Sequence, residues 1–300
     1  MGEDGGRLME PLIDKAFLSR LAHLKFIVKG RRKGHLVGAH PSPRAGMSLE
    51  FADYRDYTPG DDFRYIDWNI VGRLDRVLVK TFVREVDLPI FLLLDLSASM
   101  RLGDPPKMTY ASRLAAALAY LGLRELDRVG LYPFTDHLLP AIAPRHGMGQ
   151  MAHILHALQE ASPGGRTSLD RVLSQFVVHS RESGLVFLIS DLLSEGGYEE
   201  GISRLLHRGD EVVVIQVVDP TELRPIVTGS TRITDAETRR YVDLTVGEGT
   251  LSQYRRRLNA HEQDLKRFLA DHRIPYLLAP TDLPLETLIH ERMRSQGVLK

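Results

Sequence analysis

Oxygen-bearing side chains stand where apolar segments of this 300-residue chain end. Asp95 closes the run IFLLLD, and Ser97 and Ser99 follow it at alternate positions in DLSAS. Further along, Thr167 follows the glycine-rich stretch GGR, and Asp191 closes the run VFLISD. Burying carboxylates and hydroxyls at the end of a strand is costly unless a ligand or a hydrogen-bond partner there interacts with their oxygens. These residues are therefore the candidate functional group of the sequence.

A set of hard oxygens of this kind suits a divalent cation. Mg²⁺ takes six oxygen ligands at about 2.0 to 2.1 Å and keeps several waters beside a few protein ligands. Neutral hydroxyl ligands leave the ion electrophilic toward an incoming carboxylate or phosphate. The sequence therefore predicts a site for Mg²⁺, or for Mn²⁺ or Ca²⁺, at Asp95, Ser97, Ser99, Thr167 and Asp191.

Helix capping is the alternative explanation for these polar residues, because Ser, Thr and Asp are favoured at helix N-termini. Thr167, with Asp170 three residues later, fits a capping box as well as it fits a metal site. For the two serines of DLSAS capping is the weaker explanation, since Asp104 followed by Pro105 already marks a helix start. The ordered occurrence of the whole set favours the metal site.

Strand and helix patterns alternate from residue 88 onward. Apolar β runs occur at PIFLLLDL, RVGLYPFT, GLVFLISDLL, DEVVVIQVVD and IPYLLAP. Most are nearly continuous in Val, Ile and Leu, as expected of parallel strands covered on both faces. Amphipathic helices are predicted between them, at residues 107–126, 169–176 and 251–268. The pattern indicates an α/β fold with a doubly wound, mostly parallel sheet, in which ligands bind beyond the carboxyl ends of the strands.

The chain divides into three segments by the character of its sequence. Residues 1–33 predict a helix and a basic linker, and residues 34–87 predict a small β-rich module punctuated by Gly and Pro. Residues 88–300 form the α/β domain. Within it, residues 224–245 predict a β-hairpin insertion around a Thr-Asp-Ala-Glu turn.

The composition limits the classes of function. With 39 basic and 39 acidic residues the formal net charge is zero, so no global field attracts nucleic acid or an anionic membrane. The absence of cysteine excludes disulfides, thiolate metal sites and cysteine nucleophiles. No apolar run approaches the ~20 residues of a membrane span, and the start lacks the pattern of a signal peptide. We therefore expect a cytoplasmic protein that recognises its partners locally.

The stretch EFADYRDYTPGDDFRYIDW, residues 50–68, is a second motif. Pro59 and Gly60 fit the central positions of a type II turn, in which Gly supplies a positive φ. The acids and arginines after the turn, beginning with Asp61 and Asp62, favour a structural corner of ion pairs and aromatic rings over a binding site.

DLSAS, the later Thr167 and the Asp191 of ISD resemble the metal-ion-dependent adhesion site of von Willebrand factor A domains. That pattern is Asp-x-Ser-x-Ser, a later Thr and a later Asp, and the chain departs from it with Ala98 where many members carry Gly. The resemblance implies that Ser97, Ser99 and Thr167 touch the metal, while the two aspartates act directly or through water. It also implies that an acidic side chain of a partner protein completes the coordination.

The motif at residues 50–68 is similar to one in the bacterial family catalogued as domain of unknown function 58. In that family R-x-Y-x-P-G-D-D-x-R-x-I-D-W precedes a von Willebrand A-like domain. This chain departs from the family with Gly72 in place of Ala and Arg239 in place of Gly. The resemblance implies a partnership with a MoxR-type AAA+ ATPase, in chaperone-like complex assembly or metal-centre maturation.

An enzyme is the main alternative to a binding module. A Mg²⁺-dependent phosphoester hydrolase would use Asp95 and Asp191 with acids from the Asp61-Asp62 pair. Haloacid dehalogenase chemistry needs a second Asp where this chain has Ser97, and P-loop, dinucleotide-binding, G-x-S-x-G and H-E-x-x-H motifs are absent. We therefore predict a non-catalytic, metal-dependent protein–protein interaction module, an adaptor for a MoxR-type ATPase.

Overall fold

The computed structural model describes residues 15–21, 23–27, 34–36, 49–74, 76–84 and 89–300. The chain falls into two compact units, which are described separately. The large unit comprises residues 1–28 and 89–300, and the small unit comprises residues 29–88. The described part of the N-terminal helix thus belongs to the large unit, and the basic linker before residue 34 lies outside the described residues.

A six-stranded sheet forms the centre of the large unit, in the order β11–β8–β7–β4–β5–β6. All neighbouring pairs are parallel except β5 and β6, which are antiparallel. Every residue of β4 and β7 is buried, which explains their continuous apolar sequences. The strands are β4 (Ile90–Asp95), β5 (Val129–Phe134), β6 (Ile142–Arg145), β7 (Leu185–Ser190), β8 (Glu211–Val218) and β11 (Tyr276–Pro280).

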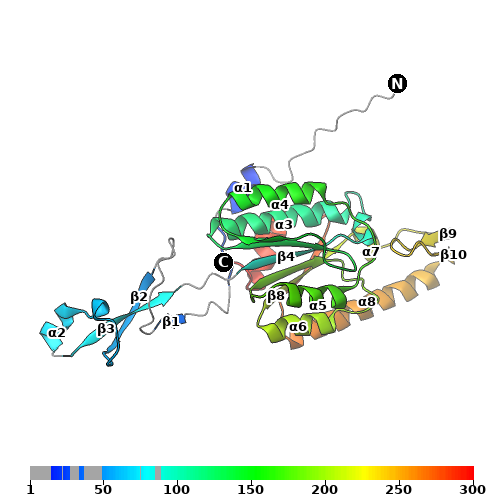
Figure 1. Ribbon diagram of the computed structural model, residues 1–300. Coiled ribbons are helices and arrows are strands. Elements are labelled where there is room, and N and C mark those ends of the chain that lie inside the picture. Colours follow the sequence, from blue (N-terminus) through cyan, green and yellow to red (C-terminus); the bar gives the residue numbers. More distant parts are fainter. Residues whose placement is uncertain (1–14, 22, 28–33, 37–48, 75, 85–88) are drawn as a thin grey trace, which may run out of the picture. The chain divides into compact units, whose positions relative to one another are not determined.

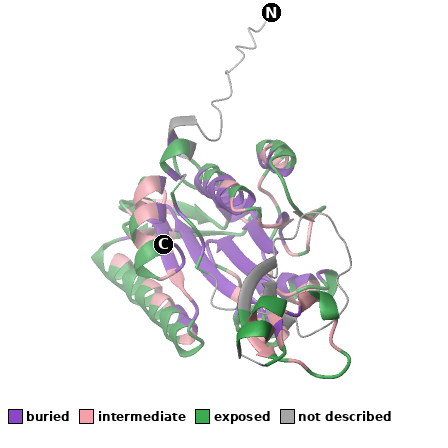
Figure 2. Ribbon diagram, turned by 90° about the vertical axis from the view of Figure 1, so that its left-hand side faces the viewer, coloured by how far each residue is buried: buried purple, intermediate pink, exposed green. Residues whose placement is uncertain are grey.

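Helices cover both faces of this sheet (Figure 1), so that its strands are buried between layers whose outer sides are exposed (Figure 2). One face packs against α1 (Lys15–Leu21), α3 (Lys107–Arg124), α4 (Gly149–Glu160) and the C-terminal turns α9 (Leu285–Thr287), Leu288–Arg292 and α10 (Met293–Ser295). The other face packs against α5 (Leu169–His179), α6 (Glu199–Arg208) and α8 (Glu248–Asp271). The architecture is the expected doubly wound α/β fold. Within the described residues, none of the helices has the length and apolar character needed to span a bilayer.

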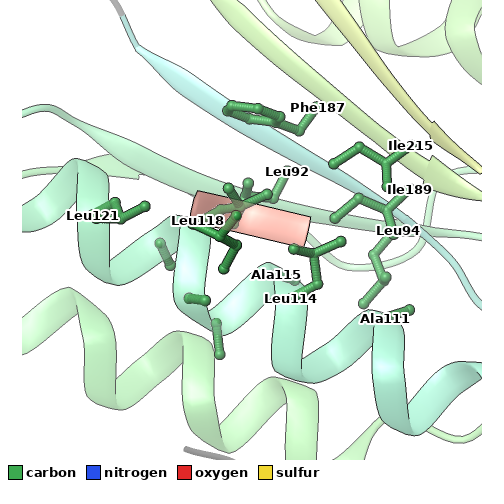
Figure 3. Packing of buried hydrophobic residues seen from close by; sticks show 14 of the residues in the cluster. Leu92, Leu94, Ala111, Leu114, Ala115, Leu118, Leu121, Phe187, Ile189 and Ile215 are labelled. Carbon is green, nitrogen blue, oxygen red and sulfur yellow. The ribbon is translucent and has the colours of Figure 1, made fainter. Parts of the chain in front are cut away.

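The packing of α3 shows how the sequence leads to this arrangement. The helix is rich in Ala and Leu, which have high helix propensity, and its apolar positions recur every three or four residues. This stripe packs on three neighbouring strands (Figure 3) through Ala111, Leu114, Ala115, Leu118 and Leu121 of the helix and Leu92, Leu94, Phe187, Ile189 and Ile215 of the sheet. Burying one such Leu or Ile contributes about 1.5–3 kcal/mol. This packing therefore fixes α3 against the centre of the sheet.

Some elements of the large unit were not predicted, among them α4, α6 and β6. The edge strand β6 contains only intermediate and exposed residues, so it has no apolar run. The buried residues of α6 are Gly201, Ile202 and Leu205, too few for a clear helical stripe among charged neighbours. Short elements at the periphery of a core carry a weak hydrophobic pattern.

The register of the sheet decides which side chains meet at its carboxyl edge. Leu94 of β4 is aligned with Ile189 of β7, so Asp95 and Ser190 are neighbours where the two strands end. Beyond the strand ends lie the short helix α7 (Pro220–Leu223) and the antiparallel hairpin of β9 (Gly229–Thr234) and β10 (Tyr241–Val246), as Figure 1 shows. A 3₁₀ turn at Ala98–Arg101 directly follows β4.

The small unit contains a three-stranded antiparallel sheet in the order β1–β3–β2. Its elements are β1 (Gly34–Leu36), β2 (Leu49–Asp56), a 3₁₀ turn at Phe63–Tyr65, α2 (Trp68–Leu74) and β3 (Leu78–Arg84). Gly60 has a φ of 109°, and the N–H of Asp61 donates to the carbonyl of Thr58 at 3.0 Å. The type II turn predicted at Pro59 and Gly60 is therefore confirmed.

Candidate metal centre

Main-chain hydrogen bonds join the loop after β4 to the loop before α5. The N–H of Gly164 donates to the carbonyl of Leu96 at 2.7 Å, and the N–H of Ala98 donates to the carbonyl of Gly165 at 3.0 Å. Gly165 has a φ of 79°, a conformation that a residue without a side chain adopts readily. The two bonds bring Thr167 to the end of β4.

The carboxylate of Asp95 is the centre of the cluster, and the residue is fully buried. Its Oδ1 accepts hydrogen bonds from the N–H of Ser97 at 2.8 Å and from the hydroxyl of Thr167 at 3.2 Å. Its Oδ2 accepts a hydrogen bond from the hydroxyl of Ser190 at 2.6 Å. Donors from three separate segments therefore hold this carboxylate in one orientation.

The hydroxyl groups of Ser97, Ser99 and Thr167 are not used to cap helices. The Oγ atoms of Ser97 and Ser99 lie 2.9 Å apart, and both residues are buried. Ser97 stands at the N-cap position of the 3₁₀ turn, but its side chain makes no capping hydrogen bond. The N-cap residue of α5 is Ser168, whereas the hydroxyl of Thr167 donates to Asp95. Capping does not account for these three hydroxyls.

A buried lysine lies beside Asp191. The side chain of Lys107 is fully buried, and its Nζ donates to Asp191 Oδ2 at 2.9 Å and to Glu222 Oε1 at 2.7 Å. Lys107 is the first residue of α3, which has Pro106 and not Asp104 at its N-cap position. The start signal assigned to Asp104 is therefore wrong, whereas the helix predicted from residue 107 begins where expected. This start places the lysine ammonium at the candidate site.

Burial controls the electrostatics of the cluster. Burial, together with the charge of Asp191, raises the pKa of Asp95 well above its usual range. Burial alone would lower the pKa of Lys107, but the carboxylates of Asp191 and Glu222 outweigh that effect and raise it. The lysine is therefore charged at neutral pH. Its single positive charge is shared by two carboxylates, those of Asp191 and Glu222.

The donor set fits a hard divalent cation. Oxygen ligands at right angles around Mg²⁺ lie about 3 Å apart, because each is about 2.1 Å from the ion. The spacing is 2.9 Å between the Oγ atoms of Ser97 and Ser99, and 3.2 Å between Thr167 Oγ1 and Asp95 Oδ1. In the described part of the chain, no three His, Asp or Glu side chains form a metal-binding group by themselves. A cation here would need the hydroxyl oxygens.

The hairpin of β9 and β10 contributes a further carboxylate, that of Glu237. Its Oε2 accepts a hydrogen bond from the N–H of Thr167 at 3.0 Å. Its Oε1 is buried and has no hydrogen-bond partner among the described residues. Burial raises the pKa of Glu237, the N–H of Thr167 opposes this effect, and the charge of Asp191 adds to it.

The acidic motif of the small unit is a network of ion pairs. Arg55 makes a two-pronged contact with Asp61, at 2.6 and 2.8 Å, and Arg64 Nη2 lies 2.6 Å from Asp62 Oδ2. The side chain of Lys80 pairs with Asp67 at 3.0 Å. Asp61 and Asp62, the predicted acids of the alternative hydrolase, are thus paired with arginines of the same unit.

Residues 53–264 match the family described as "Protein of unknown function DUF58". The chain belongs to this family. Two uncharacterised mycobacterial proteins, Rv1480 of Mycobacterium tuberculosis and Mb1516 of Mycobacterium bovis, are each 26% identical to it over 274 residues. Each alignment covers 90% of this chain and 86% of the relative. The family description leaves the activity of its members open.

Solved structures that resemble this member of the family do so at low identity. BatB from Bacteroides thetaiotaomicron is 18% identical with a TM-score of 0.43, and the match covers 70% of this chain and 98% of BatB. Manganese-loaded TRAP protein of Plasmodium vivax is 22% identical with a TM-score of 0.35, over 43% of this chain and 57% of that protein. The description of the fold rests on this chain's own strand order and helix layers.

Sequence reasoning named Asp95, Ser97, Ser99, Thr167 and Asp191, and the structure brings all of them to one strand edge. It missed the surrounding residues Ser190, Lys107, Glu222 and Glu237. Ser190 carried a usable signal, because it is the polar residue that immediately precedes Asp191 in an apolar strand. The other three stand in helices or turns where charged residues are ordinary.

Proposed function

We propose that this protein is a non-catalytic, metal-dependent protein–protein interaction module of the von Willebrand factor A type. In this proposal Asp95, Ser97, Ser99, Thr167 and Asp191 hold Mg²⁺, for which Mn²⁺ or Ca²⁺ are possible substitutes. The observation that supports it most is the convergence of three hydroxyls and the Asp95 carboxylate on one buried strand end, with oxygen spacings of 2.9 and 3.2 Å.

The residues of the site have different tasks in this proposal. Ser97, Ser99 and Thr167 offer neutral oxygens to the ion, and Asp95 supplies negative charge from a position that Ser190 stabilises. Asp191 forms an ion pair with Lys107 and is suited to hold a water molecule that is coordinated to the ion. The bound cation would supply an electrophilic position for a carboxylate of the partner. Neutral ligands preserve that character because they do not cancel the charge of the ion.

The partner that we propose is a MoxR-type AAA+ ATPase, for which this protein acts as an adaptor. The chain belongs to the family that its 50–68 motif resembles, and that resemblance is what implies such a partner. The shared task would be chaperone-like complex assembly or metal-centre maturation, with an acidic side chain of the partner completing the coordination. A cytoplasmic location is part of the proposal, because such a partner consumes ATP.

A Mg²⁺-dependent phosphoester hydrolase has less support. Both oxygens of Asp95 are engaged by donors, from Ser97 and Thr167 on one side and Ser190 on the other, which suits a fixed ligand better than a nucleophile. A general acid or base from the upstream motif would have to come from Asp61 or Asp62, and both are held by arginines. The interaction module therefore remains the better explanation of the site.

Calorimetric titration of Mg²⁺ and Mn²⁺ into the purified protein tests the metal site. We expect one ion to bind to the wild type, and affinity to fall on the order of 100-fold in Asp95→Ala and Thr167→Ala. Asp61→Ala is the matched control, since it removes a carboxylate from the small unit, and it should bind as the wild type does. Variants at Asp95 and Thr167 that bind like the wild type would contradict the proposal.

Two assays separate the interaction module from the hydrolase. The protein should not turn over p-nitrophenyl phosphate with Mg²⁺ or Mn²⁺, and turnover that disappears in Asp95→Ala would establish the hydrolase instead. A purified MoxR-type ATPase should be retained by the immobilised protein in Mg²⁺ and released by EDTA. If EDTA does not reduce the retention, the interaction does not depend on the metal.

A further inference from the structure

The tip of the β9–β10 hairpin is a tightly ordered turn that presents Glu237. Asp235 Oδ1 accepts hydrogen bonds from the N–H groups of Glu237 and Thr238, at 3.0 and 2.6 Å. The N–H of Arg239 donates to the carbonyl of Asp235 at 3.1 Å. Arg239 has a φ of 59°, which explains why glycine would suit this position. The turn geometry directs the Glu237 side chain toward the candidate metal centre.

One carboxylate oxygen of Glu237 is buried without a partner, although the residue as a whole is partly exposed. The N–H of Thr167 satisfies Oε2, at 3.0 Å, but Oε1 is buried and unpaired among the described residues. A buried acceptor without a donor is costly, and a charged one more so. A cation bound beside the Thr167 hydroxyl would lie next to this carboxylate and satisfy the remaining oxygen.

We propose that Glu237 is a ligand that the chain itself supplies to the cation. It takes the coordination position that a partner's carboxylate would otherwise occupy. This inference rests on the proposed metal site. It makes the hairpin an internal substitute for the partner, so the partner's acidic side chain binds only after Glu237 has withdrawn. Affinity for the partner is then set by competition between two carboxylates for one position.

The hairpin is built in a way that permits such withdrawal. β9 and β10 pair with each other and, in the described part of the chain, with no other strand. A two-stranded hairpin alone is marginally stable in water, so its attachment is easily exchanged. Ile233, Tyr241 and Val242 of the hairpin are exposed, and these apolar side chains are available for a partner to cover as it displaces the tip.

Mn²⁺ is the probe for the test, because the relaxation rate of water protons reports how many waters a bound Mn²⁺ carries. In Glu237→Gln and Glu237→Ala, we expect Mn²⁺ affinity to fall by about tenfold. The relaxation enhancement per bound ion should rise by roughly 1.5-fold, as when water fills three instead of two of six positions. Asp243→Asn is the matched control, since Asp243 lies on the same hairpin and pairs with Arg232.

Sodium acetate then serves as a model of the partner's carboxylate. It should lower the relaxation enhancement of Mn²⁺ bound to Glu237→Ala by displacing water, and should have little effect on the wild type or on Asp243→Asn. If the Glu237 variants match the wild type in affinity, relaxation and acetate response, while Asp95→Ala loses the ion, this inference fails and the metal site stands. If Asp95→Ala and the wild type behave alike, the metal site itself fails, and the inference with it.

Discussion

Acidic side chains gather in both units of the molecule, but their surroundings differ. In the small unit the guanidinium of Arg55 donates two hydrogen bonds to Asp61, at 2.6 and 2.8 Å, and lowers the pKa of that carboxyl well below its usual range. In the large unit Asp95 is buried among hydroxyls near Asp191, and its pKa is raised. Acids that the chain pairs with its own arginines form a structural corner. Acids that it buries with neutral oxygens form the cluster at which we propose that a cation binds.

Lys107 is the exception in the large unit, and its removal should have the largest effect. In Lys107→Met we expect the free energy of unfolding in EDTA to fall by about 3–5 kcal/mol, because Asp191 keeps a buried charge without its cation and the partly exposed Glu222 loses the same partner. Urea denaturation measures this loss. Arg55→Met, which breaks the more exposed pair of the small unit, should cost much less.

Mg²⁺ should restore part of the stability that Lys107→Met loses, since the added ion supplies positive charge to the same carboxylates. A variant as stable as the wild type would show that the buried pair is not needed.

Binding of a cation should also stabilise the wild type. Mg²⁺ at 100 times its dissociation constant should raise the free energy of unfolding by about 2.7 kcal/mol, because the ion binds only the folded state. Thr167→Val removes the hydroxyl and keeps the shape, and should lose most of the gain at the same Mg²⁺ concentration. Asp61→Ala should retain it in full. An equal gain in all three proteins would place the ion outside the strand-end cluster.

The smallest effect is expected in the small unit and depends on pH. The folded state lowers the pKa of Asp61, chiefly through the hydrogen bonds from Arg55, so this contact stabilises the unit above the unfolded pKa of about 3.9. The stabilisation is lost as the pH falls below that value toward the folded pKa. Trp68, the only tryptophan of the chain, lies in the same unit. Its fluorescence emission can therefore follow the acid transition.

Asp61→Asn should flatten this acid transition, because the side chain no longer titrates. Arg64→Gln, which breaks a pair open to solvent, is the comparison that should leave it unchanged. An acid transition identical in Asp61→Asn and in the wild type would show that Asp61 does not contribute to the pH dependence of the corner.

Much of the large unit was readable from local patterns. The runs IFLLLD and LVFLIS are buried along their whole length, so their composition alone identified central parallel strands. The Ala- and Leu-rich stripe of α3 was equally clear. In contrast, β6 and α6 were missed, because short elements at the edge of a core carry few apolar residues.

The sequence by itself determined the central strands, the turn at Pro59 and Gly60, and the polar residues at the strand ends, because these depend on neighbours a few positions away. Only the tertiary structure decided which charges share the site. Lys107 meets Asp191 across 84 positions, and Glu237 meets Thr167 across 70. Such pairs depend on strand order, register and the path of a hairpin. Local propensity and periodicity carry no information on contacts of that kind.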